Sequence, residues 1–385
     1  MMTKYVVFGL GMMGEAICYD LLSFDNKDVL GLEKDNGRID TVKKRLSQFG
    51  DRFSAIPFDV TSYTVENLAE FLREQNAILA FGAIDYSFNL FLTEACIKAG
   101  THFLDLGGNP TIVSQQHSLD KLAKNKGVTI IPDCGLAPGM VNIIAAGMIN
   151  EFEAVDSCKI RVGGLPQEPR TMLKYQQVFS IRGLTNEYLE DAKVIRNGKI
   201  MTVPSLTEVE TLEFPEPWGE LEAFQTAGGT SSLPSIYEGK IKELDYKTIR
   251  YRGHVQFFQF LKEFGFLSEH EIGGVIPRAF TEQLLQTYLP KDEPDAVLAR
   301  IVVKGNKGGR KHTDKLQLID LMDPKTGFSA MARTTAFPIS IIGQMVVEGR
   351  IKMKGVIPGE IAVPYSQFLQ ELEKRDICFE KTSEF

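Results

Sequence analysis

The chain has 385 residues, with 43 Lys and Arg against 50 Asp and Glu, so its formal net charge is −7. This acidic balance argues against general binding to a nucleic-acid backbone, which needs a broad positive surface. The length favours two domains, and 43% hydrophobic with 24% charged residues is ordinary for a soluble globular protein.

The spacing of the cysteines and histidines indicates whether the chain holds a metal or disulfides, and the N-terminal sequence indicates where the protein is located. The five cysteines are never two residues apart, and the five histidines show no ligand spacing, so we expect no metal site and no disulfide framework. The first residues, MMTKYVVFGLG, open into a strand pattern without a leader, and no apolar run approaches the roughly 18 residues of a membrane helix. We therefore expect a cytoplasmic protein that binds neither membrane nor nucleic acid.

A glycine motif follows the first strand-like run. GLGMMG places Gly9, Gly11 and Gly14 in G-x-G-x-x-G spacing, and the helical pattern EAICYDLL comes next. The first glycine permits a tight turn, the second lets backbone approach a pyrophosphate, and the third lets the helix pack on the strand. With the helix N-terminus behind it, this turn, including Met12 and Met13, predicts a dinucleotide site.

The second strand, DVLGLE, ends at Glu33, 22 residues after Gly11. An acid near that spacing accepts hydrogen bonds from the adenosine ribose and repels a 2′-phosphate, which favours NAD over NADP. Lys34 follows directly and softens this preference. The alternative is that Glu33 is a solvated strand end.

Strands and helices continue to alternate to residue 134. Six strands with intervening helices predict an α/β fold with a Rossmann doubly wound parallel sheet, whose ligands bind beyond the carboxyl ends of the strands. Asp59 and Val60 end the third strand and Gly82 and Ala83 the fourth, so we place these residues at the cofactor. Asp59 either hydrogen-bonds the adenine or caps a helix.

Three further acids follow the fourth, fifth and sixth strands: Asp85, Asp105 and Asp133. Strand ends in this topology surround the nicotinamide, so three acids there indicate a cationic or proton-exchanging substrate, although a single acid is often a cap. Asp105 is the strongest candidate because the glycines of FLDLGG allow a ligand to approach the backbone around it closely. We assign Asp85 to the substrate and Asp133 to the cofactor, and Tyr86 to positioning the substrate chain.

Residues 153–334 are mostly strand-like, with helical patterns near 255–266 and 278–288. Asn197-Gly198 predicts a hairpin turn, and the basic stretch 305–312 an exposed hairpin loop. We expect an inserted α+β domain for substrate binding and oligomerisation, built on an antiparallel sheet whose open face makes a homodimer or higher homo-oligomer. The expected domains are 1–134 with 335–385, and 135–334.

The segment KTIRYRGH concentrates cations in the inserted domain. Strand alternation places Thr248, Arg250, Arg252 and His254 on one face, with an apolar face behind. A guanidinium suits a carboxylate, and the preceding bend AGGTSSL, with Thr230, indicates backbone near a ligand. The alternatives are a solvated sheet face and, less favoured, nucleic acid. Acids for an amine and arginines for a carboxylate together predict an amino-acid substrate.

Seven motifs of the chain resemble those of lysine 6-dehydrogenases, in the saccharopine dehydrogenase-like family: GLGMMG, DLGG, IPDCGLAPGMVNI, VPSLTEVE, EAFQTAGGTSSL, YKTIRYRGH and AMARTTAF. The resemblance spans nearly the whole chain. It implies NAD-dependent oxidative deamination of the lysine ε-amine to the 6-semialdehyde, which cyclises to piperideine-6-carboxylate, with release of ammonia. Saccharopine-forming relatives typically have an arginine in the segment corresponding to TAGGTSSL, and its absence here favours the smaller substrate, although Arg250 or Arg252 could substitute.

The chemistry needs a base for the substrate amine, and Asp105 and His254 are the candidates, either as base or as proton relay. Cys134 beside Asp133 is a rival nucleophile, but no histidine lies nearby in sequence, and a small buried residue is the better interpretation. Two alternatives to lysine oxidation stay open. One is a saccharopine or carboxynorspermidine dehydrogenase of the same family, and the other is a non-catalytic nucleotide-binding sensor.

Overall fold

The computed structural model describes residues 3–291 and 293–384. Residue contacts divide the chain into two compact units, Met1–Gly147 with Ala332–Asp376 and Met148–Met331 with Ile377–Phe385. The larger segment of the second unit, Met148–Met331, is thus inserted between two segments of the first. The final nine residues belong to the second unit, whereas the sequence analysis had placed the chain's end with the nucleotide-binding domain.

The first unit contains a wholly parallel sheet, seven strands wide within the described residues, in the order β15-β6-β5-β4-β1-β2-β3. The predicted Rossmann doubly wound sheet is therefore confirmed, and the segment after residue 350 adds a seventh, two-residue strand. Its strands are β1 (Lys4–Phe8), β2 (Asp28–Glu33), β3 (Phe53–Pro57), β4 (Ala77–Gly82), β5 (His102–Asp105), β6 (Thr129–Ile131) and β15 (Gly355–Val356).

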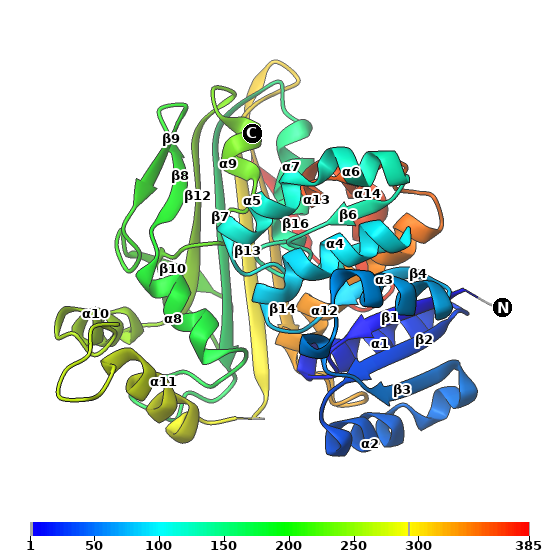
Figure 1. Ribbon diagram of the computed structural model, residues 1–385. Coiled ribbons are helices and arrows are strands. Elements are labelled where there is room, and N and C mark those ends of the chain that lie inside the picture. The colour runs from blue at the N-terminus through cyan, green and yellow to red at the C-terminus, as the bar shows by residue number, and fades with distance from the viewer. Residues whose placement is uncertain (1–2, 292, 385) are drawn as a thin grey trace. The chain divides into compact units, whose positions relative to one another are not determined.

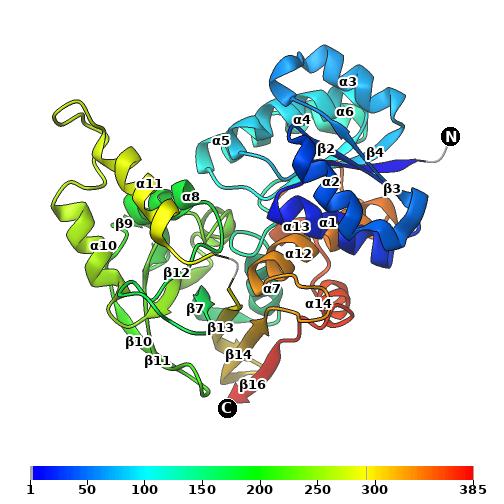
Figure 2. The same cartoon turned by 90° about the horizontal axis from the view of Figure 1, so that it is seen from below.

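Helices cover both faces of this sheet, as its hydrophobic strands require. Val6 and Phe8 pack with Leu68 and Leu92 from the helices on one face, shown above the sheet in Figure 2. On the other face, a Cβ built on Gly343 would lie 2.5 Å from the Phe81 ring. The helices of the unit are α1 (Met12–Phe24), α2 (Asn36–Arg45), α3 (Val65–Glu74), α4 (Asn89–Ala99), α5 (Pro110–Ser118), α6 (Asp120–Lys126), α7 (Met140–Asn150), α12 (Ala330–Val347), α13 (Gly359–Ala362) and α14 (Tyr365–Glu373), of which α7 and α12 run across its boundaries.

Helix α12 is the one described helix that is long and apolar enough to cross a membrane by length and composition. The sequence analysis expected no apolar run of that length. In the structure, 89% of this stretch is buried, and Gly343 places the helix directly against Phe81. Burial of this kind is what an apolar core helix of a globular protein shows.

The second unit contains a nine-stranded sheet, of which seven strands follow the order β10-β11-β12-β7-β13-β14-β16. Figure 1 shows its long central strands side by side. The sheet is mixed rather than antiparallel as expected, because β7 and β12 pair in parallel. Its strands are β7 (Ala154–Pro166), β8 (Ala192–Arg196), β9 (Lys199–Val203), β10 (Glu210–Phe214), β11 (Gly219–Gln225), β12 (Ile241–Tyr251), β13 (Asp295–Lys307), β14 (Arg310–Leu321) and β16 (Glu380–Glu384).

Two predicted turns of this sheet can be compared with the structure. Asn197 and Gly198 join β8 to β9 with φ of 51° and 79°, as a type I′ hairpin requires, so that prediction is confirmed. The basic stretch 305–312 lies mostly within β13 and β14, and only Gly308 and Gly309 form the turn. Helices of the unit are α8 (Ile181–Leu189), α9 (Leu233–Tyr237), α10 (His254–Glu263) and α11 (Pro277–Tyr288).

A buried ion pair joins the C-terminal end of the first unit to α1. Arg375 donates from Nε to Asp20 Oδ1 at 2.7 Å and from Nη2 to Asp20 Oδ2 at 3.0 Å, and neither side chain is exposed. Glu371 accepts from the same guanidinium, which lies 3.9 Å from the Phe24 ring centroid. Both charges are thus removed from water and satisfied by each other.

We expect Arg375→Met to lower the free energy of unfolding by about 3–5 kcal/mol, because it leaves the Asp20 carboxylate buried without its cation. Urea unfolding followed by circular dichroism measures the loss. Arg170→Met is the matched control, since Arg170 pairs with Glu168 at the surface and should change stability by less than about 1 kcal/mol. Equal effects of the two substitutions would contradict this account.

Candidate active site

The turn between β1 and α1 has the backbone shape that a pyrophosphate requires. Gly9 has φ of 88°, and a Cβ there would lie 2.6 Å from the Ala83 carbonyl oxygen. A Cβ on Gly14 would lie 1.8 Å from the Gly9 carbonyl oxygen, so the helix packs against the turn at a distance only glycine allows. At Gly11 no described atom lies within 4 Å of the added Cβ, which leaves open space in front of the α1 N-terminus.

The Glu33 carboxylate lies against this turn. Its Oε2 accepts from the Leu10 backbone N–H at 2.8 Å, and its Oε1 accepts from Lys34 N–H at 2.9 Å. The nearby guanidiniums of Arg38 and Arg45 pair with Glu15 instead. The Glu33 carboxylate at the end of β2 is therefore held beside the phosphate-binding turn.

The other residues expected at the cofactor lie at the same edge of the sheet. Met12 is exposed and Met13 partly exposed at the start of α1, and Ala83 donates its N–H to the Phe8 carbonyl. Asp59 caps a short 3₁₀ turn that starts at Val60, and hydrogen bonds from the Thr61 hydroxyl and N–H lower its pKa. The capping role weighed for Asp59 is the one its carboxylate has in the structure.

Asp105 and Asp133 come together beyond β5 and β6. Asp105 is fully buried and accepts from Gln116 Nε2 at 2.6 Å, from Gly107 N–H at 2.8 Å and from Asp133 N–H at 3.4 Å. Burial raises the pKa of Asp105 to about 6 against the lowering effect of these hydrogen bonds. A Cβ on Gly107 would lie 1.9 Å from Asp133 Oδ1, so only glycine fits between the two acids.

Tyr86 reaches this group and Asp85 does not. A Cβ on Gly108 would lie 3.3 Å from the Tyr86 ring, and a Cβ on Gly82 would lie 3.2 Å from Asp105 Cβ. The exposed Asp85 carboxylate accepts from the Ser87 N–H and hydroxyl, which makes it the cap of a 3₁₀ turn. Of the three strand-end acids, Asp105 is buried and accepts from the backbone N–H of the half-buried Asp133, whereas Asp85 closes its own turn.

Cys134 follows this network but is not reactive. Its thiol is buried and donates to the Ile131 carbonyl oxygen at 3.3 Å. Burial, with the charges of Asp105 and Asp133, raises the pKa of the thiol well above its usual value. The thiol stays protonated, which is the structural role favoured by the sequence analysis and excludes a thiolate nucleophile.

The basic segment 247–254 does not continue as a strand to its end. Strand β12 ends at Tyr251, Gly253 turns with φ of 95°, and His254 begins α10. The prediction that Arg252 and His254 share the alternating face of Thr248 and Arg250 is therefore wrong. Gly253, three residues after Arg250, lies in the left-handed region and breaks the alternation.

Arg250 is buried, with 2% of its surface exposed, and makes no ion pair with any described residue. Its Nε donates to the Tyr188 hydroxyl at 3.1 Å, and its Nη1 donates to the Ile249 carbonyl oxygen at 2.9 Å. The guanidinium carbon lies 5.0 Å from the Tyr175 ring centroid. A buried guanidinium without a carboxylate is costly, and such a charge marks a place for an anionic ligand.

The hydrogen bonds around Arg250 have a defined direction. His254 Nδ1 is 2.8 Å from the Leu173 carbonyl oxygen, which can only accept, so Nδ1 carries the proton. Nε2 then accepts from the Tyr188 hydroxyl at 3.0 Å, and that hydroxyl accepts from Arg250. Burial and the charge of Arg250 lower the pKa of His254 to about 3, so the imidazole is neutral.

Glu187 supplies a negative charge beside this chain. Burial raises the pKa of its carboxyl to about 7, and the nearby positive charge of Arg250 opposes that rise. Among the described residues no ion pair joins Glu187 to Arg250. We call Tyr175, Glu187, Tyr188, Arg250 and His254 the Arg250 cluster. It presents one cation and one titrating acid that do not neutralise each other by direct contact.

The remaining predicted substrate residues differ in their surroundings. Thr248 is buried with its hydroxyl 2.7 Å from that of Thr226, and the Thr230 hydroxyl donates to the Lys193 carbonyl at 3.2 Å. Arg252 is exposed and forms an ion pair with Glu220. The structure thus separates the two arginines, because Arg252 forms an ion pair and Arg250 forms none with a described residue, although the Glu187 carboxyl lies near enough to interact with its charge.

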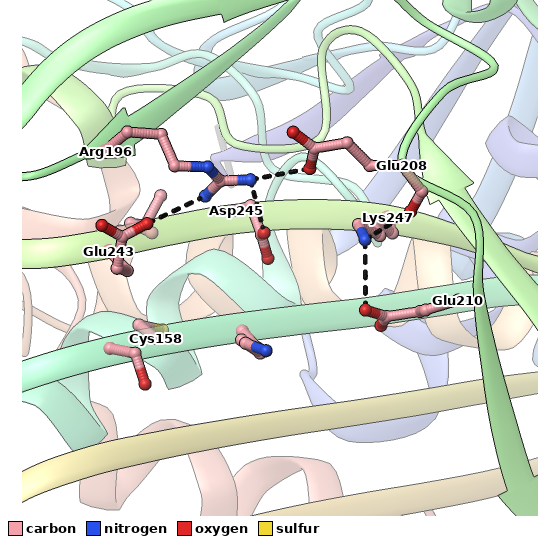
Figure 3. Close-up of a pocket in the computed structure, with 10 residues that line it drawn as sticks. Cys158, Arg196, Glu208, Glu210, Glu243, Asp245 and Lys247 are labelled. Atoms are coloured by element: carbon pink, nitrogen blue, oxygen red, sulfur yellow. Dashed lines mark hydrogen bonds and ion pairs between the residues drawn. The ribbon is translucent and has the colours of Figure 1, made fainter.

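A pocket of about 280 Å³ lies elsewhere in the second unit, lined by strands β7, β8 and β12 and by charged side chains (Figure 3). Arg196 is directed at Asp245 and Glu208, at 2.9 and 2.8 Å, and Lys247 at Glu210, at 3.1 Å. These cations and acids already neutralise one another. Because its charges are already paired, this pocket is a weaker candidate for binding a charged substrate than the Arg250 cluster.

Sequence reasoning missed three members of this cluster: Tyr175, Glu187 and Tyr188. Tyr175 lies in an irregular loop, and the other two lie on α8, more than 60 residues before Arg250. No short motif joins them to KTIRYRGH. The available signal was the acid–aromatic pair Glu187-Tyr188 on a short helix, which by itself is unspecific.

Family comparisons cover almost the whole chain. Residues 5–131 match the family model described as the saccharopine dehydrogenase NADP binding domain. Residues 135–377 match the model described as the saccharopine dehydrogenase C-terminal domain. The boundary between the two matches follows β6.

Curated relatives are distant. An NADP(+)-dependent, L-glutamate-forming saccharopine dehydrogenase of Pyricularia oryzae is 26% identical over 202 residues, 50% of this chain and 44% of that protein. A carboxyaminopropylagmatine dehydrogenase of Synechocystis sp. is 22% identical over 400 residues, 96% of this chain and 95% of that protein. The chain spans about half the length of several of the curated relatives it matches.

Among solved structures, the apo L-Glu-forming saccharopine dehydrogenase of Saccharomyces cerevisiae superposes with a TM-score of 0.79 at 19% identity, covering 100% of both chains. At that identity the similarity establishes a shared fold.

Proposed function

The chain belongs to the saccharopine dehydrogenase family, and from this premise we propose that it oxidises the ε-amine of L-lysine with NAD. Loss of hydride leaves an iminium, water adds to its carbon, and release of ammonia gives the 6-semialdehyde, which cyclises with loss of water to piperideine-6-carboxylate. The alternatives within the family are oxidation of saccharopine or of a carboxylated polyamine, and outside catalysis a nucleotide-binding sensor.

The observation that carries this proposal is the buried charge of Arg250, which forms no ion pair with a described residue. A free amino acid has a carboxylate and an ammonium on neighbouring atoms. Arg250 suits the carboxylate, since a guanidinium binds it through paired hydrogen bonds. Glu187, which is ionised above about pH 7, suits the α-ammonium. Because the two side chains do not pair with each other, both keep capacity for a ligand.

The number of free cations favours lysine over saccharopine. Saccharopine carries an added glutamate arm with two further carboxylates, whereas the Arg250 cluster contains a single cation. Arg252 pairs with Glu220, Lys247 pairs with Glu210, and TAGGTSSL contains no arginine. The described residues of the cluster therefore match one carboxylate.

The reaction requires a neutral amine. Nicotinamide, when bound, accepts the hydride from the carbon that carries the nitrogen. A lysine amine has a pKa of about 10.4, so its deprotonation at pH 7 costs roughly 4–5 kcal/mol. We propose Asp105, ionised above about pH 6, as the acceptor of this proton, with Tyr86 and Asp133 held beside it by the Gly107-Gly108 turn.

His254 is less suited to that role than the sequence analysis supposed. Its Nε2 lone pair already accepts from Tyr188, and its pKa of about 3 makes it a very weak base. Through Tyr188 it instead orients the Arg250 guanidinium. We therefore propose His254 as a positioning residue.

NAD rather than NADP is the proposed cofactor. Support comes from the Glu33 carboxylate, which backbone N–H groups hold beside the phosphate-binding turn and which would repel a 2′-phosphate. The names of the matched family model and of several relatives specify NADP, so cofactor choice is part of the test.

The deciding experiment follows reduced-nicotinamide absorbance with NAD or NADP and each of four amines: lysine, saccharopine, carboxynorspermidine and carboxyaminopropylagmatine. We expect the highest kcat/KM with lysine and NAD. Turnover of another amine in the absence of lysine turnover would assign that substrate instead. Dinucleotide binding without turnover of any amine would support the sensor.

Arg250→Met should raise the KM for lysine about 10- to 100-fold, because a charge-assisted pair contributes about 1.5–3 kcal/mol. Arg252→Met, two residues away and paired at the surface, is the matched control and should change KM less than about twofold. The specific readout is the preference for lysine over 1,5-diaminopentane, which lacks the carboxylate. Loss of activity with an unchanged preference would show that Arg250 is merely structural.

A pH profile tests Glu187. Its carboxyl pKa is raised to about 7, so kcat/KM for lysine should rise as pH increases through 7 and the acid becomes charged. In Glu187→Gln this step should be absent. With 6-aminohexanoate, which lacks the α-ammonium, the wild-type profile should also lack it. An identical step in the wild type and the variant would remove Glu187 from substrate binding.

A further inference from the structure

A buried acid at the start of α1 pairs with two arginines of α2. Glu15 directly follows the last glycine of GLGMMG and is 2% exposed. Its Oε2 accepts from Arg38 Nη2, and its Oε1 lies 2.9 Å from Arg45 Nε. The two arginine side chains remain 32% and 41% exposed, whereas the acid that binds them lies inside. Two cations of α2 thus converge on one carboxylate behind the phosphate-binding turn.

Arg38 also contacts the phosphate-binding turn itself. Its Nε donates to the Leu10 carbonyl oxygen, while Glu33 Oε2 accepts from the Leu10 N–H at 2.8 Å. The guanidinium of Arg38 and the carboxylate of Glu33 are therefore bound to the two polar backbone atoms of a single residue. A ligand group that approaches Glu33 at the end of β2 consequently also approaches Arg38.

Lys34 adds a second cation at this edge of the sheet. It directly follows Glu33 and is exposed. Hydrogen bonds from Thr61 lower the pKa of Asp59, and the positive charge of Lys34 lowers it further, which places Lys34 near the carboxyl end of β3. Two cations, Lys34 and Arg38, therefore lie close to Glu33. Because an arginine near the adenosine ribose can accommodate a 2′-phosphate, Glu33 alone does not decide between NAD and NADP.

Glu15 changes what Arg38 can offer such a phosphate. Its carboxylate opposes the charge of the guanidinium and occupies one of its nitrogens. Since Glu15 is buried, a phosphate that drew Arg38 away would leave the acid with Arg45, in a place with little water. The pair is therefore costly to break, and a 2′-phosphate gains less from Arg38 than it would from an unpaired arginine.

Given the proposed use of NAD, on which this role depends, we propose that Glu15 is a second specificity-determining residue for the cofactor. Glu33 repels a 2′-phosphate directly, and Glu15 withholds from it the guanidinium of Arg38. Arg45 binds the other oxygen of Glu15 and thereby helps to hold the carboxylate in place. A neutral side chain at position 15 frees the charge of Arg38 and shifts the preference toward NADP.

Isothermal titration calorimetry with ADP-ribose and 2′-phospho-ADP-ribose tests this role without any amine or turnover. Glu15→Gln keeps the shape of the side chain and removes its charge. The affinity for 2′-phospho-ADP-ribose relative to ADP-ribose should then rise about 10-fold, as one freed charge-assisted hydrogen bond provides. Arg38→Met in the same background should abolish the rise. Glu66→Gln is the matched control, because Glu66 pairs with Lys98 between α3 and α4 and should change the ratio less than about twofold.

A second measurement leaves Glu15 in place, so that it is decisive even if circular dichroism shows that Glu15→Gln does not fold. In a Glu33→Gln background, Arg38→Met should change the ratio of the two affinities less than about threefold, because Glu15 still opposes the charge of Arg38. A loss of about 10-fold or more would show that Arg38 binds the 2′-phosphate despite Glu15, which would overturn the role.

Two results with Glu15→Gln would also overturn it and leave the proposed cofactor untouched. One is an unchanged ratio, and the other is an equal change in both affinities, which would make Glu15 merely structural. A wild type that binds 2′-phospho-ADP-ribose more tightly than ADP-ribose would instead contradict the proposed use of NAD, and with it the role of Glu15.

Discussion

The guanidinium of Arg250 is a charge that the second unit buries without a carboxylate, and much of that unit's polar interior is arranged around it. Tyr188 and two backbone carbonyls accept its hydrogen bonds, and Tyr175 covers it with a ring face. These contacts engage Nε and Nη1 but bring no carboxylate of the described residues into direct contact with the guanidinium. The protein thereby holds a positive potential in a place with little water, where an anion gains more from it than at the surface.

Three other buried arginines of the protein form ion pairs. Arg375 shares two hydrogen bonds with Asp20, and Arg161 forms ion pairs with Asp245 and Glu210. Arg278 is likewise joined to Glu269 and Glu282. Against that background Arg250 is an exception that packing alone does not explain. Burial is the main cause of the lowered pKa of His254, and the nearby positive charge of Arg250 lowers it further, because an imidazolium there would be repelled by the guanidinium.

Features of the fold that are determined by residues adjacent in sequence could be predicted, whereas features that depend on pairing with distant segments could not. The glycine turn, Glu33 and six strands of the parallel sheet follow from adjacent residues, and the structure has them where the sequence indicated. Strands β15 and β16 were not predicted, because two residues and the polar run EKTSE become strands only by pairing with distant neighbours. The mixed second sheet was missed for the same reason, since the parallel pairing of β7 and β12 joins residues 86 positions apart in the sequence.

Within the candidate site, periodicity failed where a single residue changed the conformation. Gly253, with a positive φ, ends the alternation that had grouped Arg250 with Arg252 and His254. Helix α11 shows the same limit at larger scale. Its sequence has an apolar and a polar face, and an amphipathic helix usually packs its apolar face against the protein core. Arg278 reverses that outcome, because its guanidinium donates to Thr185, Asn186 and Glu269 outside the helix and would lose these partners in solvent. Sequence patterns thus identify faces, while the partners available to one buried charge decide which face is covered.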